Sequence, residues 1–130
     1  MKKAKTSKLG LNFRNLILIL LFVFVIISIF SLVDYFAHSL SEKYSVPSWY
    51  FRNKIIFGTM IGFIAYLWVR KKGLFTRSFV FSLLISVLLQ TRYFLEGYPL
   101  DFVILFLFIH FIILLPVSLI IFKLAGNLIR

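Results

Sequence analysis

The sequence contains no cysteine, and only four of its 130 residues are acidic. The absence of cysteine excludes disulfide exchange, thiolate metal sites and cysteine nucleophiles. The chain also has no polar stretch long enough to form a separate soluble domain. Any functional site must therefore be built from helix ends, short loops or the interior of a helical bundle.

Long apolar runs dominate the rest of the chain. Hydrophobic residues make up 62% and aromatic residues 19% of the sequence, whereas an ordinary soluble domain is about half apolar. A helix needs roughly 20 apolar residues to cross the hydrocarbon of a bilayer. We therefore predict a single all-α integral membrane domain over residues 1–130, an up-down bundle of four transmembrane helices at about 16–36, 49–69, 78–95 and 100–124.

The charges are sorted by sign between these runs. If the first run starts in the cytoplasm, eleven of the fifteen basic residues and none of the acidic residues lie on the cytoplasmic side. Because basic residues are retained there during insertion, we predict a plasma-membrane protein with both termini in the cytoplasm and a basic tail at 1–14. The opposite side would hold Lys43, Arg52, Lys54 and Arg92 with Asp34, Glu42, Glu96 and Asp101.

The net charge of +11 has a topological origin in this interpretation. Nucleic-acid binding is not predicted, because the chain has no folded basic surface large enough to read a groove. The expected partners are the lipid bilayer, anionic lipid headgroups on the cytoplasmic side, and other membrane proteins or a second copy of the chain.

Small residues form one face of the second predicted helix. Gly58 and Gly62 are four residues apart, and Ala65 follows about one turn later. Such a face lets two helix backbones approach closely in lipid. The pattern predicts either packing inside one chain or a homo-oligomer interface, and it does not distinguish the two.

Polar residues gather near the outer ends of all four predicted helices. Asp34 and His38 lie one turn apart on the first helix, and Arg92 and Glu96 have the spacing of a salt bridge. The cluster has two interpretations: mutual neutralisation at the membrane surface, or an outward-facing pocket for an anionic headgroup or solute. Its members are Asp34, His38, Asn53, Lys54, Gln90, Arg92, Tyr93, Glu96 and Asp101.

Asp34 and His38 are weak candidates for metal ligands, because a carboxylate and an imidazole four residues apart on a helix can share an ion. A protein metal site normally has at least three ligands, and Glu42 or Glu96 could be the third. We therefore predict neither a metal nor a cofactor.

Two further polar residues lie deeper in the predicted membrane. His110 is nine residues after Asp101, or roughly 13 Å along a helix. Ser86 belongs to a stripe of serines on the third helix that ends at Gln90. We expect His110 to bond Ser86, Gln90 or a backbone carbonyl, and to lie more than a helical turn deeper than His38. A proton-relay residue or a cofactor ligand is the alternative role.

These observations leave three classes of function. We predict a small polytopic membrane protein that acts as a non-catalytic subunit or interaction partner within a membrane protein complex. The alternative is an oligomeric transporter or channel for a small solute or ion, with an outward-facing polar pocket. The third class is an enzyme at the membrane interface that uses Asp34, His38 and Lys54 on a lipid-like substrate.

Overall fold

The computed structural model describes residues 11–128, which form four long helices and one short 3-10 helix. The basic tail predicted at 1–14 lies mostly outside the described residues. The helix boundaries are α1 (Phe13–His38), η2 (Glu42–Tyr44), α2 (Trp49–Val69), α3 (Leu74–Leu95) and α4 (Leu100–Ala125). The prediction of four helices is confirmed.

Two of the helices begin before the predicted apolar segments. At the start of α1, the side chain of Asn12 accepts a hydrogen bond from the backbone N–H of Asn15 at 2.8 Å and caps the helix. The helix therefore begins at Phe13, three residues before the predicted start. Helix α3 begins at Leu74, four residues before its predicted start, with Gly73 as its N-cap residue. The apolar pattern predicts only the apolar part of a helix. Polar turns extend the helix beyond the predicted boundary.

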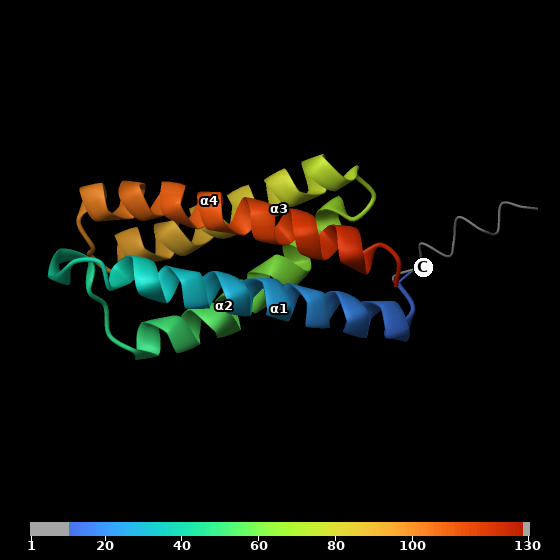
Figure 1. The fold of residues 1–130 in the computed structure, drawn as a ribbon, viewed down its shortest axis with the longest axis horizontal. Helices are drawn as coiled ribbons and strands as arrows, with labels where there is room; N and C mark the ends of the chain where they lie inside the picture. The colour runs from blue at the N-terminus through green and yellow to red at the C-terminus, as the bar shows by residue number, and fades with distance from the viewer. Residues whose placement is uncertain (1–10, 129–130) are drawn as a thin grey trace, which may run out of the picture.

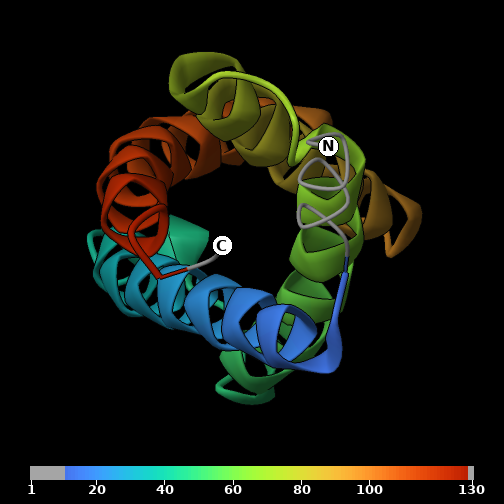
Figure 2. The same ribbon diagram turned by 90° about the vertical axis from the view of Figure 1, so that its right-hand side faces the viewer.

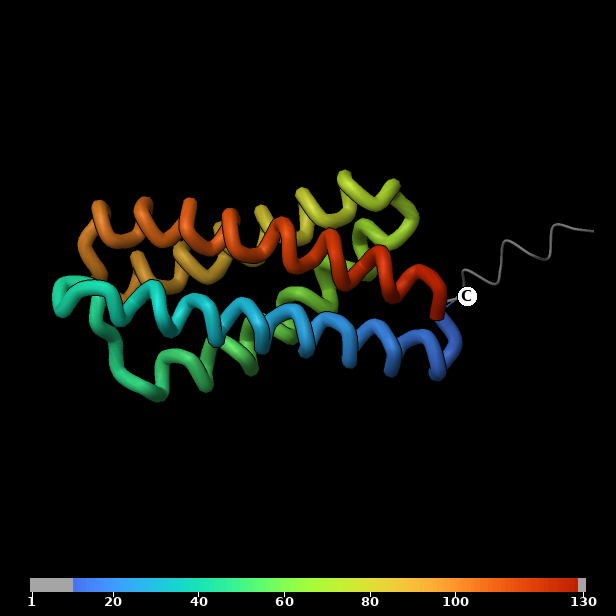
Figure 3. Tube along the Cα trace, viewed as in Figure 1, coloured from blue at the N-terminus to red at the C-terminus, as the bar shows by residue number. Residues whose placement is uncertain are grey.

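The four helices form an antiparallel ring. Helix α1 packs against α2 and α4, and α3 packs against the same two helices. Figure 1 and the tube in Figure 3 show the helices running alternately along the long axis, and Figure 2 shows them arranged in a ring around a common centre. The α2–α3 and α3–α4 connections are only four residues long, which makes consecutive helices antiparallel neighbours. Gly97 adopts a φ of 98° in the second of these turns, a conformation that favours glycine.

The two ends of the bundle carry different charges. We call the end with the α1–α2 and α3–α4 connections the acidic end (left in Figure 1), and the opposite end the basic end. All four acidic residues belong to the acidic end, in the last turns of α1, in η2, after α3 and in the first turn of α4. The basic end holds the cationic α2–α3 connection and the described ends of the chain.

Three of the four helices, α1, α3 and α4, are long and apolar enough to cross a membrane. Helix α2 has 21 residues, but the consecutive polar residues Arg52, Asn53 and Lys54 lower its apolar content. The protein is therefore an all-helical bundle with three helices able to span a bilayer.

The face formed by Gly58, Gly62 and Ala65 is buried within the chain. A Cβ atom added at Gly58 would lie 3.1 Å from Ile27 of α1, and one added at Gly62 would lie 2.8 Å from Val23 of α1. The small residues thus let α2 approach α1 closely within one chain. This is the internal packing allowed by the sequence pattern, and it leaves this face covered rather than available to a second copy.

These contacts predict different effects of alanine at three glycines. Gly62→Ala should lower the free energy of unfolding by about 1–2 kcal/mol, because Val23 and Phe81 have to shift to make room. Gly58→Ala should be close to neutral, since a gain in helix propensity offsets a milder contact. Gly73, where an added Cβ meets no atom within 4 Å, is the control without a packing contact. As the N-cap residue of α3 it should lose only about 0.5 kcal/mol on replacement by alanine. Unfolding in detergent micelles measures all three, and equal effects at Gly62 and Gly73 would contradict this packing.

Candidate functional site

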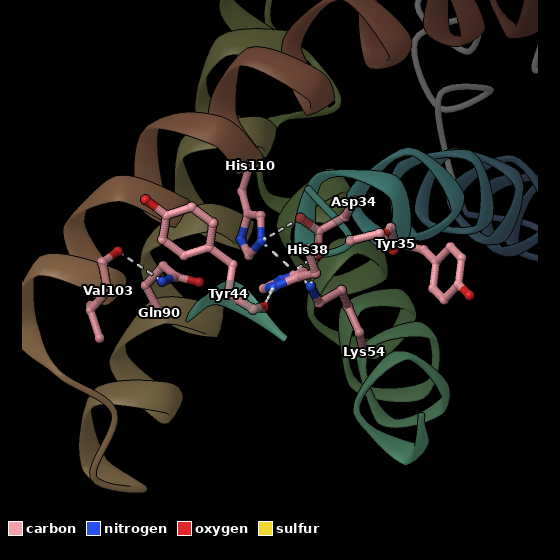
Figure 4. A network of polar contacts seen from close by, with 9 residues as sticks. Asp34, Tyr35, His38, Tyr44, Lys54, Gln90, Val103 and His110 are labelled. Atoms are coloured by element: carbon pink, nitrogen blue, oxygen red, sulfur yellow. Dashed lines mark hydrogen bonds and ion pairs between the residues drawn. The ribbon is translucent and has the colours of Figure 1, made fainter. Parts of the chain in front are cut away.

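The centre of the candidate site is the carboxylate of Asp34, which is completely buried in the bundle near the acidic end. Lys54 of α2 forms an ion pair with Asp34 Oδ2, and His110 Nε2 of α4 lies 3.2 Å from Asp34 Oδ1. Lys54 Nζ also lies 3.4 Å from His110 Nε2. Figure 4 shows these side chains converging from three helices. We call Asp34, His38, Lys54 and His110 the buried cluster.

His38, the last residue of α1, is the fourth member of the buried cluster. Its Nε2 atom lies 3.3 Å from Asp34 Oδ2, and its Nδ1 atom lies 2.7 Å from the backbone carbonyl oxygen of Tyr44. A carbonyl oxygen can only accept, so Nδ1 carries the proton and donates this bond. The imidazole is also stacked on the ring of Phe106, with a centroid separation of 4.0 Å and parallel planes. These two contacts fix the ring with Nε2 directed at the carboxylate.

Aromatic rings surround the ammonium group of Lys54. Its Nζ atom lies 5.0–5.7 Å from the ring centroids of Phe30, Tyr50, Phe51 and Tyr93. At such distances an aromatic ring attracts a cation, most strongly where water is excluded. The surroundings of Asp34 are therefore built to hold positive charge.

Some polar atoms of the buried cluster form no hydrogen bond within the described residues. They include Asp34 Oδ1, His38 Nε2 and His110 Nδ1. Asp34 Oδ1 lies 3.2 Å from His110 Nε2, and His38 Nε2 lies 3.3 Å from Asp34 Oδ2. Neither contact has the geometry of a hydrogen bond. A buried polar atom without a partner costs free energy, so this arrangement has capacity for a further ligand.

A pocket of about 350 Å³ opens at the acidic end and reaches His38. It is lined by residues of the end of α1, the α1–α2 connection and the start of α2, among them Tyr35, Ser41, Glu42 and Phe51. His38 itself is only 3% exposed. The imidazole thus lies between the pocket and the buried carboxylate.

The structure brings together three of the residues predicted to meet at the outer end, namely Asp34, His38 and Lys54. It also adds His110, which was expected to lie deeper and to bond Ser86, Gln90 or a backbone carbonyl. The expected bonding partners are wrong, because His110 Nε2 lies against Asp34 and Lys54 instead. The expected depth is nearly right, since His110 lies about one helical turn below the level of His38. His38 of α1 stacks on Phe106 of α4, so these two residues lie at the same level. Asp34 comes one turn before His38 and His110 one turn after Phe106. Because the two helices are antiparallel, Asp34 and His110 also lie at the same level and can meet.

The other predicted residues of the outer end do not join the buried cluster. The side-chain NH₂ of Gln90 donates to the carbonyl oxygen of Val103 at 2.8 Å, which links α3 to α4. Arg92 and Glu96 form a partly exposed pair at 3.1 Å, and Asp101 pairs with Lys43 at the surface. Tyr93 packs on Tyr50 at 4.4 Å beside Lys54.

Two predicted polar residues have less defined roles. Asn53 is half-buried and borders a small cavity beside Arg92, Tyr93 and Glu96. Ser86 is fully buried and forms no hydrogen bond within residues 11–128, whereas its neighbour Ser82 contacts Ser118 of α4 at 3.2 Å.

Three residues that position the buried cluster, Phe30, Tyr44 and Phe106, are not among those predicted from the sequence. The spacing of Phe106 and His110, one turn apart, placed both on one face of α4. No feature of the sequence indicated that the Tyr44 carbonyl would meet His38, because that contact depends on how the α1–α2 connection folds back.

Comparison of the chain with models of known protein families, with curated proteins and with solved structures finds no match. What the site can do chemically must therefore be inferred from its own geometry. Among residues 11–128, Asp34, His38 and His110 form a group of possible metal ligands whose donor atoms all lie within 4.8 Å of one another. His110, rather than Glu42 or Glu96, supplies the third donor.

The buried ion pair predicts strong coupling between Asp34 and Lys54. Asp34→Asn or Lys54→Met alone leaves one buried charge without its partner, and each should lower the free energy of unfolding by about 3–5 kcal/mol. The double variant removes both charges, so its loss should be well below the sum of the two.

Unfolding of the four proteins in detergent micelles gives the coupling free energy from a double-mutant cycle. The partly exposed pair of Arg92 and Glu96 is the matched control, and Arg92→Gln should change stability by about 1 kcal/mol or less. Strictly additive losses at Asp34 and Lys54 would show that their ion pair does not hold the bundle together.

Proposed function

We propose that the protein crosses the plasma membrane four times and has both termini in the cytoplasm. The sorting of charge between the two ends of the bundle supports this topology, because the basic end has the charge of a cytoplasmic face. Lys54 would be the main obstacle to a spanning α2, but its charge is neutralised by Asp34 inside the bundle. Arg52 is exposed at the acidic end, where its side chain can reach water.

Single cysteines test this topology directly, since the chain has none of its own. Ser41→Cys and Lys72→Cys place a thiol in the exposed connections before and after α2. On intact cells a membrane-impermeant maleimide should label Ser41→Cys, and should label Lys72→Cys only after permeabilisation. Labelling of both on intact cells, or of neither, would show that α2 does not cross the membrane.

Within this topology the protein is a non-catalytic subunit or interaction partner of other membrane proteins. The observation that carries this proposal is the closure of the buried cluster: its charged groups pair with one another inside the bundle. A large substrate has no access to Asp34, Lys54 or His110, which are at most 1% exposed. An enzyme acting on lipids through these groups would need them to be accessible.

The outside of the bundle supplies the surface for this role. Large apolar side chains on every long helix point away from the interior, for example Phe36 on α1, Trp68 on α2, Phe75 on α3 and Phe108 on α4. In a bilayer such side chains contact lipid or the helices of a partner through van der Waals packing. The bundle would then be a rigid body held together from inside, with its exterior available for assembly.

Extraction of native membranes with a mild detergent tests the subunit role. A partner protein should copurify with the tagged chain in a fixed ratio. The double variant Asp34→Asn/Lys54→Met should retain it, because the partner contacts the exterior of the bundle rather than the buried cluster. Recovery of the chain as a lone single copy in several mild detergents would argue against this function.

Transport of a small cation is the second candidate. It is favoured by His38, which borders the outer pocket and contacts Asp34. Towards the basic end, however, the interior next to the buried cluster is filled by Phe30, Ile26 and Ile27, all completely buried. These apolar side chains block the path of a cation from the buried cluster towards the basic end. A single chain is therefore better suited to bind a cation than to transport it.

A further inference from the structure

We infer that Asp34, His38 and His110 form a binding site for a divalent transition-metal ion of the zinc class, which competes with the ammonium group of Lys54. This inference goes beyond the proposed function and does not depend on it. Its starting point is the convergence of one carboxylate and two imidazoles from α1 and α4 on one buried point.

The spacing of the donor atoms fits such an ion. Two ligands at about 2.0–2.1 Å from a tetrahedral zinc ion are about 3.3 Å apart. Asp34 Oδ2 lies 3.3 Å from His38 Nε2, and Asp34 Oδ1 lies 3.2 Å from His110 Nε2. These two distances involve different oxygens of the carboxylate, and the three donor atoms lie within 4.8 Å of one another, so the side chains have to move closer together to surround one ion.

The protonation of His38 also fits a metal ligand. Because Nδ1 donates to the Tyr44 carbonyl, the neutral imidazole presents the lone pair of Nε2 to Asp34. A lone pair facing a carboxylate oxygen, with no proton between them, is unfavourable unless a cation lies between the two. Histidine ligands in metal sites usually donate their other ring N–H to a carbonyl or carboxylate in this manner.

Lys54 identifies the place of the cation. Its ammonium group contacts the same carboxylate and lies 3.4 Å from the same His110 nitrogen that would bind the ion. A metal ion and the ammonium cannot share this position, since like charges at such a distance repel strongly in a buried site. Binding would thus exchange one cation for the other, with the lysine head group moving aside.

The chemistry of the donors selects the class of ion. Two imidazoles and one carboxylate suit zinc, cobalt, nickel or copper, whereas magnesium and calcium prefer oxygen ligands. The pocket that reaches His38 at the acidic end gives the route of entry. Three protein ligands leave one coordination position for water or another small ligand.

Titration of the full chain in lipid nanodiscs with Co²⁺ or Zn²⁺ alone tests the site. The protein carries an affinity tag without histidine and is first treated with a chelator. Wild type should bind one ion with the visible absorption of nitrogen- and oxygen-ligated cobalt. Lys54→Met should bind about tenfold more tightly or better, because it lacks the competing charge, and the ion should raise its melting temperature.

Two control variants separate the buried site from surface binding. Asp34→Asn/Lys54→Met keeps a neutral interior but lacks a ligand, so its affinity should fall by more than roughly 100-fold from that of Lys54→Met. Asp101→Asn, at an exposed acidic residue of the same end that does not line the pocket, should bind as wild type does. The inference is overturned if wild type binds neither ion, if Lys54→Met binds no more tightly than wild type, or if the Asp34-lacking variant binds equally well.

Discussion

The buried negative charge of Asp34 is the constraint on which the rest of this bundle depends. An isolated carboxylate inside a membrane-embedded protein is costly unless positive charge compensates it. Lys54 supplies that charge from α2, while His38 and His110 approach from the end of α1 and from α4. One side chain thereby couples three of the four helices. In lipid, where apolar side chains gain little by leaving the solvent, such polar contacts can specify which helices pair and in what register.

The α1–α2 connection has a structural role that follows from this constraint. It is the longest connection between the long helices, and its 3-10 helix η2 places the Tyr44 carbonyl against His38. The Tyr44 ring also packs against Phe102 and Phe106 of α4. The connection thus covers the acidic end of the bundle, holds His38 in a defined orientation and forms part of the wall of the pocket that reaches His38. Gln90, bonded to the Val103 carbonyl, ties α3 to α4 near the same end, so that α3 is fixed to the bundle without contributing a charge.

Much of this architecture could be predicted from local features of the sequence. The lengths of the apolar runs predicted the four helices, because such runs are a local signal that does not depend on how the helices pack. The proximity of Asp34 and His38 followed from their spacing of one turn. The contact with His110 did not, because the relative shift of α1 and α4 is set by packing between helices, here of His38 on Phe106.

The small-residue face was equally ambiguous in sequence. The spacing of Gly58 and Gly62 shows that another helix can approach closely, but only the structure shows that this helix is α1 of the same chain.

The central claim, an ionised Asp34 held by Lys54 inside the bundle, can be tested most directly by infrared spectroscopy of the protein in lipid at neutral pH. The difference spectrum between wild type and Asp34→Asn isolates the absorption of this one side chain. The account predicts that the variant loses the bands of an ionised carboxylate. Loss of a protonated carboxyl band instead would mean that Asp34 is neutral, and that no ion pair organises the bundle.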